Sequence, residues 1–132
     1  MIKIYHNPRC QKSRKALQIL IESGKEFQVR EYLKVLISKE ELTSVISLLR
    51  LSPIDLVRKG ERIWKEKYKD KVLSDDEIIQ IMIENLRLIE RPIVTHNNLA
   101  VVGRQKTSLK LSNFLRFLFT LLLFNKRLTR VL

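Results

Sequence analysis

The only cysteine of this 132-residue chain lies in a stretch that favours a reactive thiol. Cys10 follows a short apolar segment and Pro8, and a helical pattern begins at about Gln11. The first turn of a helix carries unpaired N–H groups and a partial positive charge, so it stabilises an anion. Because the thiolate is the nucleophilic form of cysteine, Cys10 is expected to ionise readily beside a site for an oxyanion.

Basic and hydroxyl side chains around Cys10 strengthen this expectation. The basic neighbours are His6, Arg9, Lys12 and Arg14. As cations they should all lower the pKa of the thiol, and the Ser13 hydroxyl can donate a hydrogen bond to the sulfur. The alternative is that Cys10 is a small buried apolar residue, as many free cysteines are. We favour the reactive cysteine, because a buried structural cysteine is not usually flanked by so many charges.

The segments around Cys10 are predicted to form a strand, a helix and a second strand. Residues 2–4 alternate between apolar and polar, which is typical of a strand. The helix is expected over about 11–23, with Gly24 as its C-terminal stop. The second strand is expected over 27–29, with 31–32 as a candidate extension. This strand–helix–strand order favours a parallel pair.

Three further helix starts and a hairpin follow. The helix starts are Ser38 with Glu41, Ser52 with Pro53, and Ser74 with Glu77. The first and last are capping boxes, and the middle one combines a cap with a first-turn proline. The runs 93–95 and 99–102 flank Asn97-Asn98, a pair that tolerates the positive φ of a tight hairpin, whereas the structure of 58–73 is left open. The order βαβ, helices, ββ hairpin and C-terminal segment is that of an α/β, thioredoxin-like fold with a mixed sheet.

Three pieces of the sequence occur in order along residues 1–104. They are His6-Asn7-Pro8-Arg9-Cys10 with Lys12-Ser13-Arg14, then Leu56-Val57-Arg58-Lys59, and then Ile89-Glu90-Arg91-Pro92-Ile93-Val94 with Val101-Val102-Gly103-Arg104. Together they resemble the signature of the ArsC family of glutaredoxin-linked arsenate reductases. The resemblance implies one ArsC-like domain over residues 1–132, in which the helices between residues 38 and 88 are an insertion into the thioredoxin-like fold and the chain ends in a helix.

The resemblance also implies a role for each matched residue. Cys10 would be the catalytic nucleophile. The implied thiolate-tuning residues are His6, Ser13 and Arg14. The implied oxyanion-binding residues are Arg58, Arg91, Arg104 and Asn7, the last of which either donates to an oxygen or positions the loop. Planar guanidinium groups suit this task because each donates two hydrogen bonds at once. Pro92 would be a cis-proline opposite the cysteine, although trans is the safer prediction from sequence alone.

The implied reaction is attack of the Cys10 thiolate on the arsenic of arsenate. A lone cysteine cannot resolve the adduct by an internal disulfide, so an external thiol is needed. In the family this thiol is glutathione, and glutaredoxin regenerates the cysteine. No tightly bound cofactor and no metal are expected, and the protein is expected to be a monomer.

The charge of the chain is strongly basic and unevenly distributed. The formal net charge is +12, and residues 91–132 contain eight basic side chains and no acidic one. A basic protein attracts anions, including small oxyanions and nucleic acid. Nucleic-acid binding is not expected, because the chain has no recognised motif and few aromatic residues for base stacking. The N-terminus has no secretory pattern, no segment is long enough to span a membrane, and a single cysteine suits a reducing compartment, so a cytoplasmic protein is expected.

The C-terminal segment departs from the family pattern. Residues 114–124 are unusually apolar, and no acidic residue follows Glu90. Three explanations stay open: a C-terminal helix packed on the sheet, a basic amphipathic anchor, or a changed reading frame after Arg104.

Two other functions also stay open. One is a related thiol oxidoreductase that acts on glutathione mixed disulfides. The other is a regulator that binds RNA polymerase, as in the Spx family, which shares the fold. The typical Spx redox sensor is a Cys-x-x-Cys pair, and Ser13 occupies the second position here, so a disulfide switch within the chain is impossible.

Overall fold

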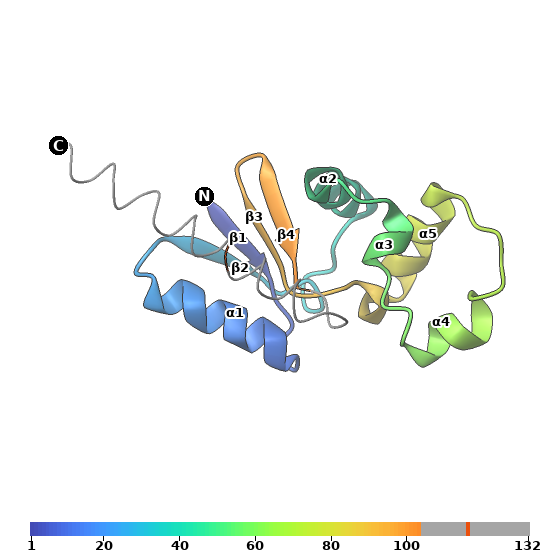
Figure 1. Ribbon diagram of the computed structural model, residues 1–132, viewed down its shortest axis with the longest axis horizontal. Coiled ribbons are helices and arrows are strands. Elements are labelled where there is room, and N and C mark those ends of the chain that lie inside the picture. Colours follow the sequence, from blue (N-terminus) through green and yellow to red (C-terminus); the bar gives the residue numbers. More distant parts are fainter. Residues whose placement is uncertain (104–115, 117–132) are drawn as a thin grey trace.

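The part of the chain that the computed structural model describes, residues 1–103 and 116, contains a four-stranded mixed sheet. The strands are β1 (Ile2–Tyr5), β2 (Phe27–Arg30), β3 (Ile93–His96) and β4 (Leu99–Val102). Their order is β2-β1-β3-β4, with β1 parallel to β2 and antiparallel to β3, and β3 antiparallel to β4 (Figure 1). The predicted parallel βαβ unit and the hairpin are therefore both confirmed.

Helix α1 covers one face of the sheet. It spans Gln11–Glu22, and its buried residues Ala16 and Leu20 pack against Ile4 and Val94. The helix lies along the sheet in Figure 1, away from the other helices. This packing fixes the direction in which the N-terminus of α1 points.

The opposite face of the sheet carries the inserted helices. They are α2 (Lys39–Leu49), α3 (Pro53–Leu56), α4 (Arg62–Lys67), α5 (Asp75–Glu84) and the 3-10 helix η1 (Leu86–Leu88). Tyr5 and Ile93, which are paired in the sheet, belong to the core of this layer together with Leu42, Trp64 and Met82. Because side chains alternate along a strand, neighbouring residues of β1 and β3 enter two different cores.

Serine caps begin two of the inserted helices, as predicted. The hydrogen bonds run from the Glu41 N–H to Ser38 Oγ (3.1 Å) and from the Glu77 N–H to Ser74 Oγ (3.2 Å). Ser52 is the N-cap of α3 and Pro53 lies in the first turn, but the Ser52 side chain makes no capping bond. The residue types alone thus located all three helix starts.

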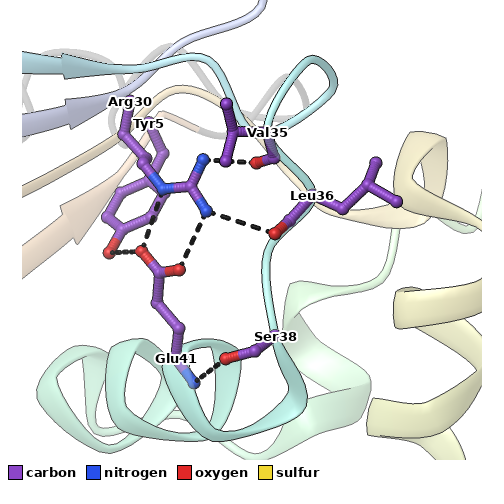
Figure 2. Close-up of polar contacts among 6 residues, drawn as sticks. All are labelled: Tyr5, Arg30, Val35, Leu36, Ser38 and Glu41. Atoms are coloured by element: carbon purple, nitrogen blue, oxygen red, sulfur yellow. Dashed lines mark hydrogen bonds and ion pairs between the residues drawn. The ribbon is translucent and has the colours of Figure 1, made fainter.

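Glu41 does not complete a capping box, because its carboxylate is bound elsewhere. It accepts hydrogen bonds from the Tyr5 hydroxyl at 3.0 Å and from Arg30 at 3.2 and 3.0 Å (Figure 2). Arg30 also donates to the carbonyl groups of Val35 and Leu36. One polar network therefore joins β1, β2 and the start of α2.

Two turns contain a residue with positive φ where the sequence predicts one. Gly24 has a φ of 70° and follows the end of α1, and Asn97 has a φ of 53° in the turn between β3 and β4. A third residue, Arg50, has a φ of 53° at the end of α2, which its residue type does not predict.

Two stretches extend or correct the prediction from sequence. Strand β2 ends at Arg30, so Glu31 and Tyr32 lie in the following turn and not in the strand. Residues 58–73 contain α4, which buries Trp64 against the inserted helices.

The approach of β4 to the start of β3 is unusually close. The Arg91–Pro92 peptide bond is cis, as the family resemblance suggested. The Gly103 N–H donates to the Pro92 carbonyl at 2.9 Å. A Cβ atom on Gly103 would lie 3.0 Å from Pro92 Cδ, so a side chain there would displace the proline.

The predicted C-terminal helix and Arg104 lie outside the described residues. Among the helices that are described, none is both long enough and apolar enough to cross a bilayer.

Candidate active site

Cys10 lies at the N-terminus of α1, in the position that the sequence predicts. It is the N-cap residue, with extended backbone angles (φ −92°, ψ 121°), and its carbonyl accepts the first helical hydrogen bond from the Arg14 N–H at 3.0 Å. The Cys10 N–H donates to the Asn7 carbonyl at 3.0 Å, which closes a turn before the helix. The thiol is free and partly exposed.

The surroundings of the sulfur lower the pKa of Cys10. Partial burial alone would raise it. The backbone N–H of Ser13, the Arg91 guanidinium and the backbone N–H of Lys12 outweigh burial, because each interacts favourably with the thiolate. The site therefore favours the nucleophilic form of Cys10.

The Ser13 and His6 side chains contact each other. Ser13 is fully buried, and its Oγ lies 2.6 Å from His6 Nδ1 and accepts a hydrogen bond from the Asn7 N–H at 3.0 Å. Burial lowers the pKa of His6 below its ordinary value of 6.5, which favours the neutral imidazole. The surroundings thus disfavour the cationic His6 that the sequence suggests, and the backbone N–H is the group of Ser13 that lowers the pKa of Cys10. The thiolate-tuning roles of both side chains stay predictions.

Asn7 and Arg14 are also part of the loop structure. The buried Asn7 side chain accepts a hydrogen bond from the Arg9 N–H through Oδ1, at 3.0 Å. Arg14 Nη1 donates to the Pro8 carbonyl at 2.9 Å, and the charge of Arg14 helps to lower the pKa of His6. These contacts match the loop-positioning role expected for Asn7, whereas its donation to an oxyanion stays a prediction.

The segment 56–58 places one predicted arginine. Val57 and Ile89 form an isolated antiparallel bridge, and the Arg58 N–H donates to the Leu88 carbonyl at 2.7 Å. The Arg58 side chain contacts Glu61 at 2.7 Å and Glu90 at 4.0 Å. Two carboxylates therefore hold a guanidinium that the family resemblance assigns to the oxyanion.

Arg91 directly precedes the cis-proline and reaches the thiol. Its Nη1 donates to the Arg87 carbonyl at 3.2 Å. Its Nε is buried and has no hydrogen-bond partner among the described residues. An unpaired buried donor beside a thiolate fits a site that receives an anion.

Tyr32 is a member of this cluster that the sequence reasoning missed. Its pKa is raised by burial, and the charges of Arg91, Cys10 and Arg58 all act on its hydroxyl. The Arg91 side chain also approaches this hydroxyl as a donor, but without the geometry of a normal hydrogen bond. The available signal was topological: β1 and β2 are parallel, so the residues that follow them lie at one edge of the sheet. The structure thus gathers Cys10, Arg58 and Arg91 around Tyr32, and Arg104 lies outside the described residues.

A cavity of about 560 Å³ lies beside the loop that precedes Cys10. Its walls include both basic and acidic side chains. They are Arg9, Lys34, Arg87, Arg91, Glu31 and Glu61. Arg91 lines this cavity and also acts on the Cys10 thiol. The size of the cavity suits a small-molecule ligand.

Comparisons with known proteins agree with this geometry. The model of the ArsC family matches residues 5–110. The chain is 42% identical over 105 residues to the uncharacterized protein YfgD of Escherichia coli K12, and the aligned region covers 78% of this chain and 88% of that protein. It is 39% identical to an arsenate reductase of Neisseria meningitidis serogroup B, covering 78% of this chain and 90% of that protein. The solved arsenate reductase of Vibrio cholerae has a TM-score of 0.73 and 42% identity, covering 78% of this chain and 89% of that one. The chain therefore belongs to the ArsC family.

Proposed function

We propose that this protein reduces arsenate to arsenite through a covalent adduct between Cys10 and arsenic. The observation that carries the proposal is the thiol at the N-terminus of α1, whose pKa two backbone N–H groups and Arg91 lower against the effect of burial. The relatives named as arsenate reductases support an oxidoreductase that acts on this oxyanion.

In the first step the Cys10 thiolate attacks arsenic, an S–As bond forms and one As–OH bond breaks. The departing hydroxide takes a proton and leaves as water, and arsenic stays in the +5 state. Arg58, Arg91 and Arg104 hold the remaining oxygens, where negative charge concentrates. The α1 N-terminus adds backbone donors to the same anion.

In the second step an external thiol completes the reduction. Cys10 is the only cysteine, so two electrons must come from the Cys10 sulfur and the incoming thiol together. Arsenic is released in the +3 state as arsenite, and the two sulfurs are left as a mixed disulfide. We propose glutathione as this thiol and glutaredoxin as the protein that restores Cys10, which suits a reducing cytoplasm. The cavity beside Arg91 offers charges of both signs for a small peptide that carries an ammonium group and carboxylates.

The test is arsenate-dependent NADPH consumption in a coupled assay with glutathione, glutaredoxin and glutathione reductase. We expect turnover by the wild-type protein and none by Cys10→Ser, because a hydroxyl at this position is a far weaker nucleophile. Replacing glutaredoxin by thioredoxin in a parallel arm identifies the reductant. Wild-type protein that alkylates readily at Cys10 but gives no turnover with either reductant would contradict the arsenate reaction.

A related activity on glutathione mixed disulfides is the second candidate, and the cavity beside Arg91 and the loop before Cys10 favours it. The Cys10 thiolate would then attack sulfur and not arsenic. The unpaired Arg91 Nε favours arsenate, because a disulfide offers no strong acceptor for that N–H.

A further inference from the structure

Two buried side-chain atoms in residues 1–103 and 116 have no hydrogen-bond partner, the Tyr32 hydroxyl oxygen and Arg91 Nε. Burying an unpaired polar atom costs free energy, so such atoms are rare and call for a reason. Here both atoms belong to residues that interact electrostatically with each other and with Cys10. Two unpaired donors at one thiolate indicate a ligand that accepts hydrogen bonds.

The backbone holds Tyr32 firmly at this place. Its N–H donates to the Arg30 carbonyl at 3.1 Å in the turn after β2, and the residue is only 2% exposed. The ring packs within the core of the inserted helices, and this packing holds the buried hydroxyl in place. It faces the charges of Arg91, Arg58 and Cys10, which come from three other segments.

The surroundings decide what this hydroxyl can do. Burial raises the pKa of Tyr32 above its ordinary value of 10.0, with Arg91 and Arg58 opposing and the thiolate adding to the effect. The phenol therefore stays protonated at neutral pH and has one O–H to donate. Neither guanidinium can accept this hydrogen bond, whereas an anion that the guanidinium groups also attract would supply the acceptor.

We propose that Tyr32 is a further oxyanion-binding residue, whose hydroxyl donates a hydrogen bond to an oxygen of the tetrahedral anion held at Cys10 and Arg91. The inference rests on the proposed function only in that the ligand is an oxyanion. It adds a neutral donor, from the turn after β2, to the arginines and the helix N-terminus. It also explains why a buried hydroxyl is left without a protein partner.

The test compares two buried tyrosines that differ in one respect. Tyr32→Phe removes an unpaired hydroxyl, whereas Tyr5→Phe removes one that is bonded to Glu41 at 3.0 Å. The rate of Cys10 alkylation by iodoacetamide is measured against increasing arsenate, phosphate or sulfate, which gives the concentration that half-protects the thiol. Thermal unfolding of both variants is followed in parallel.

We expect Tyr32→Phe to raise the half-protecting concentration of arsenate about tenfold or more, since it loses a hydrogen bond to a charged group. Its melting temperature should stay equal to wild type or rise, because the Tyr32 hydroxyl makes no hydrogen bond of normal geometry with the described residues. Tyr5→Phe should show the reverse, a lower melting temperature with unchanged protection.

Equal protection of the wild type and Tyr32→Phe would overturn the inference, as would absence of protection in the wild type. A fall in melting temperature for Tyr32→Phe would reveal a structural partner and overturn it as well. The proposed function fails separately: a wild-type protein that phosphate protects through Tyr32, but that does not reduce arsenate, would leave this inference standing.

Discussion

The Arg91 guanidinium reaches the Cys10 thiol from a segment on the other side of the helical insertion. Local sequence could suggest a lowered thiol pKa from the helix N-terminus alone. The contribution of Arg91 arises only when β3 pairs with β1, which brings the start of β3 to the end of β1. A tertiary contact thus completes a site that the first helical turn begins.

Replacing Arg91 by alanine should raise the pKa of Cys10. The thiolate fraction falls as pH drops through this pKa, so the alkylation profile of Arg91→Ala should lie at higher pH than that of wild type. At pH 7 its alkylation should be severalfold slower. The measurement is the iodoacetamide rate from pH 5 to 9.

Arg87→Ala is the matched control, because Arg87 is exposed and contacts Arg91 through its backbone carbonyl. Its profile should overlay that of wild type. Coincident profiles for Arg91→Ala and wild type would show that the backbone N–H groups alone ionise the thiol.

At the scale of elements, hydrogen bonds among Tyr5, Arg30 and Glu41 connect α2 to strands β1 and β2. Burial would raise the pKa of Glu41, but hydrogen bonds from Arg30 and Tyr5 outweigh it and lower the pKa below 4.5. The carboxylate therefore stabilises the fold above pH 4.5, and this stabilisation is lost as pH falls through the lowered pKa.

Glu41→Gln should reduce the free energy of unfolding by roughly 1 to 3 kcal/mol at pH 7, because it loses charged hydrogen bonds. The difference from wild type should shrink below pH 4.5, where the carboxylate protonates first in the unfolded chain and then, at the lowered pKa, in the folded protein. Urea unfolding at pH 7, 5 and 3.5 measures both effects, with the exposed Glu40→Gln as control. A difference that is as large at pH 3.5 as at pH 7 would rule out the carboxylate as its source.

Gly103→Ala should disturb the strand ends that hold Arg91. The new Cβ would meet Pro92 Cδ at 3.0 Å, so we expect a loss of about 1 to 3 kcal/mol of stability and weaker protection of Cys10 by arsenate. In Gly60→Ala the new Cβ has no atom within 4 Å, and its stability should stay within about 0.5 kcal/mol of wild type. Equal unfolding curves for the two variants would contradict this expectation, because they would mean that Pro92 moves aside at no measurable cost in stability.

At the scale of the whole molecule, the elements set by near neighbours could be predicted from the sequence. The serine caps of α2 and α5, the Gly24 stop and the Asn97 turn depend on residues a few positions apart, and all were located correctly. The candidate extension of β2 to Glu31 and Tyr32 is wrong, because the strand ends at Arg30. Tyr32 is buried by the inserted helices and not by strand pairing.

The contents of the site were less predictable, since they depend on contacts between distant segments. Nothing in the sequence shows that His6 is buried with a lowered pKa, or that its Nδ1 contacts the Ser13 hydroxyl. The roles of Arg58 and Arg91 came from the family resemblance, because both look like ordinary surface charges in a chain with a net charge of +12. Tyr32 had no local signal, as a single tyrosine after a strand is a common sequence feature.

The division of the sheet into two cores has a consequence for how such proteins diversify. Cys10 is carried by the helix of one core, whereas Tyr32 belongs to the other core and the segments of Arg58 and Arg91 adjoin it. Mutations at distant positions that share no partner affect stability nearly independently, so changes in one core away from the shared strands can accumulate with little effect on the other core. Evolution can therefore remodel the pocket that selects the ligand while the nucleophile and its helix stay as they are.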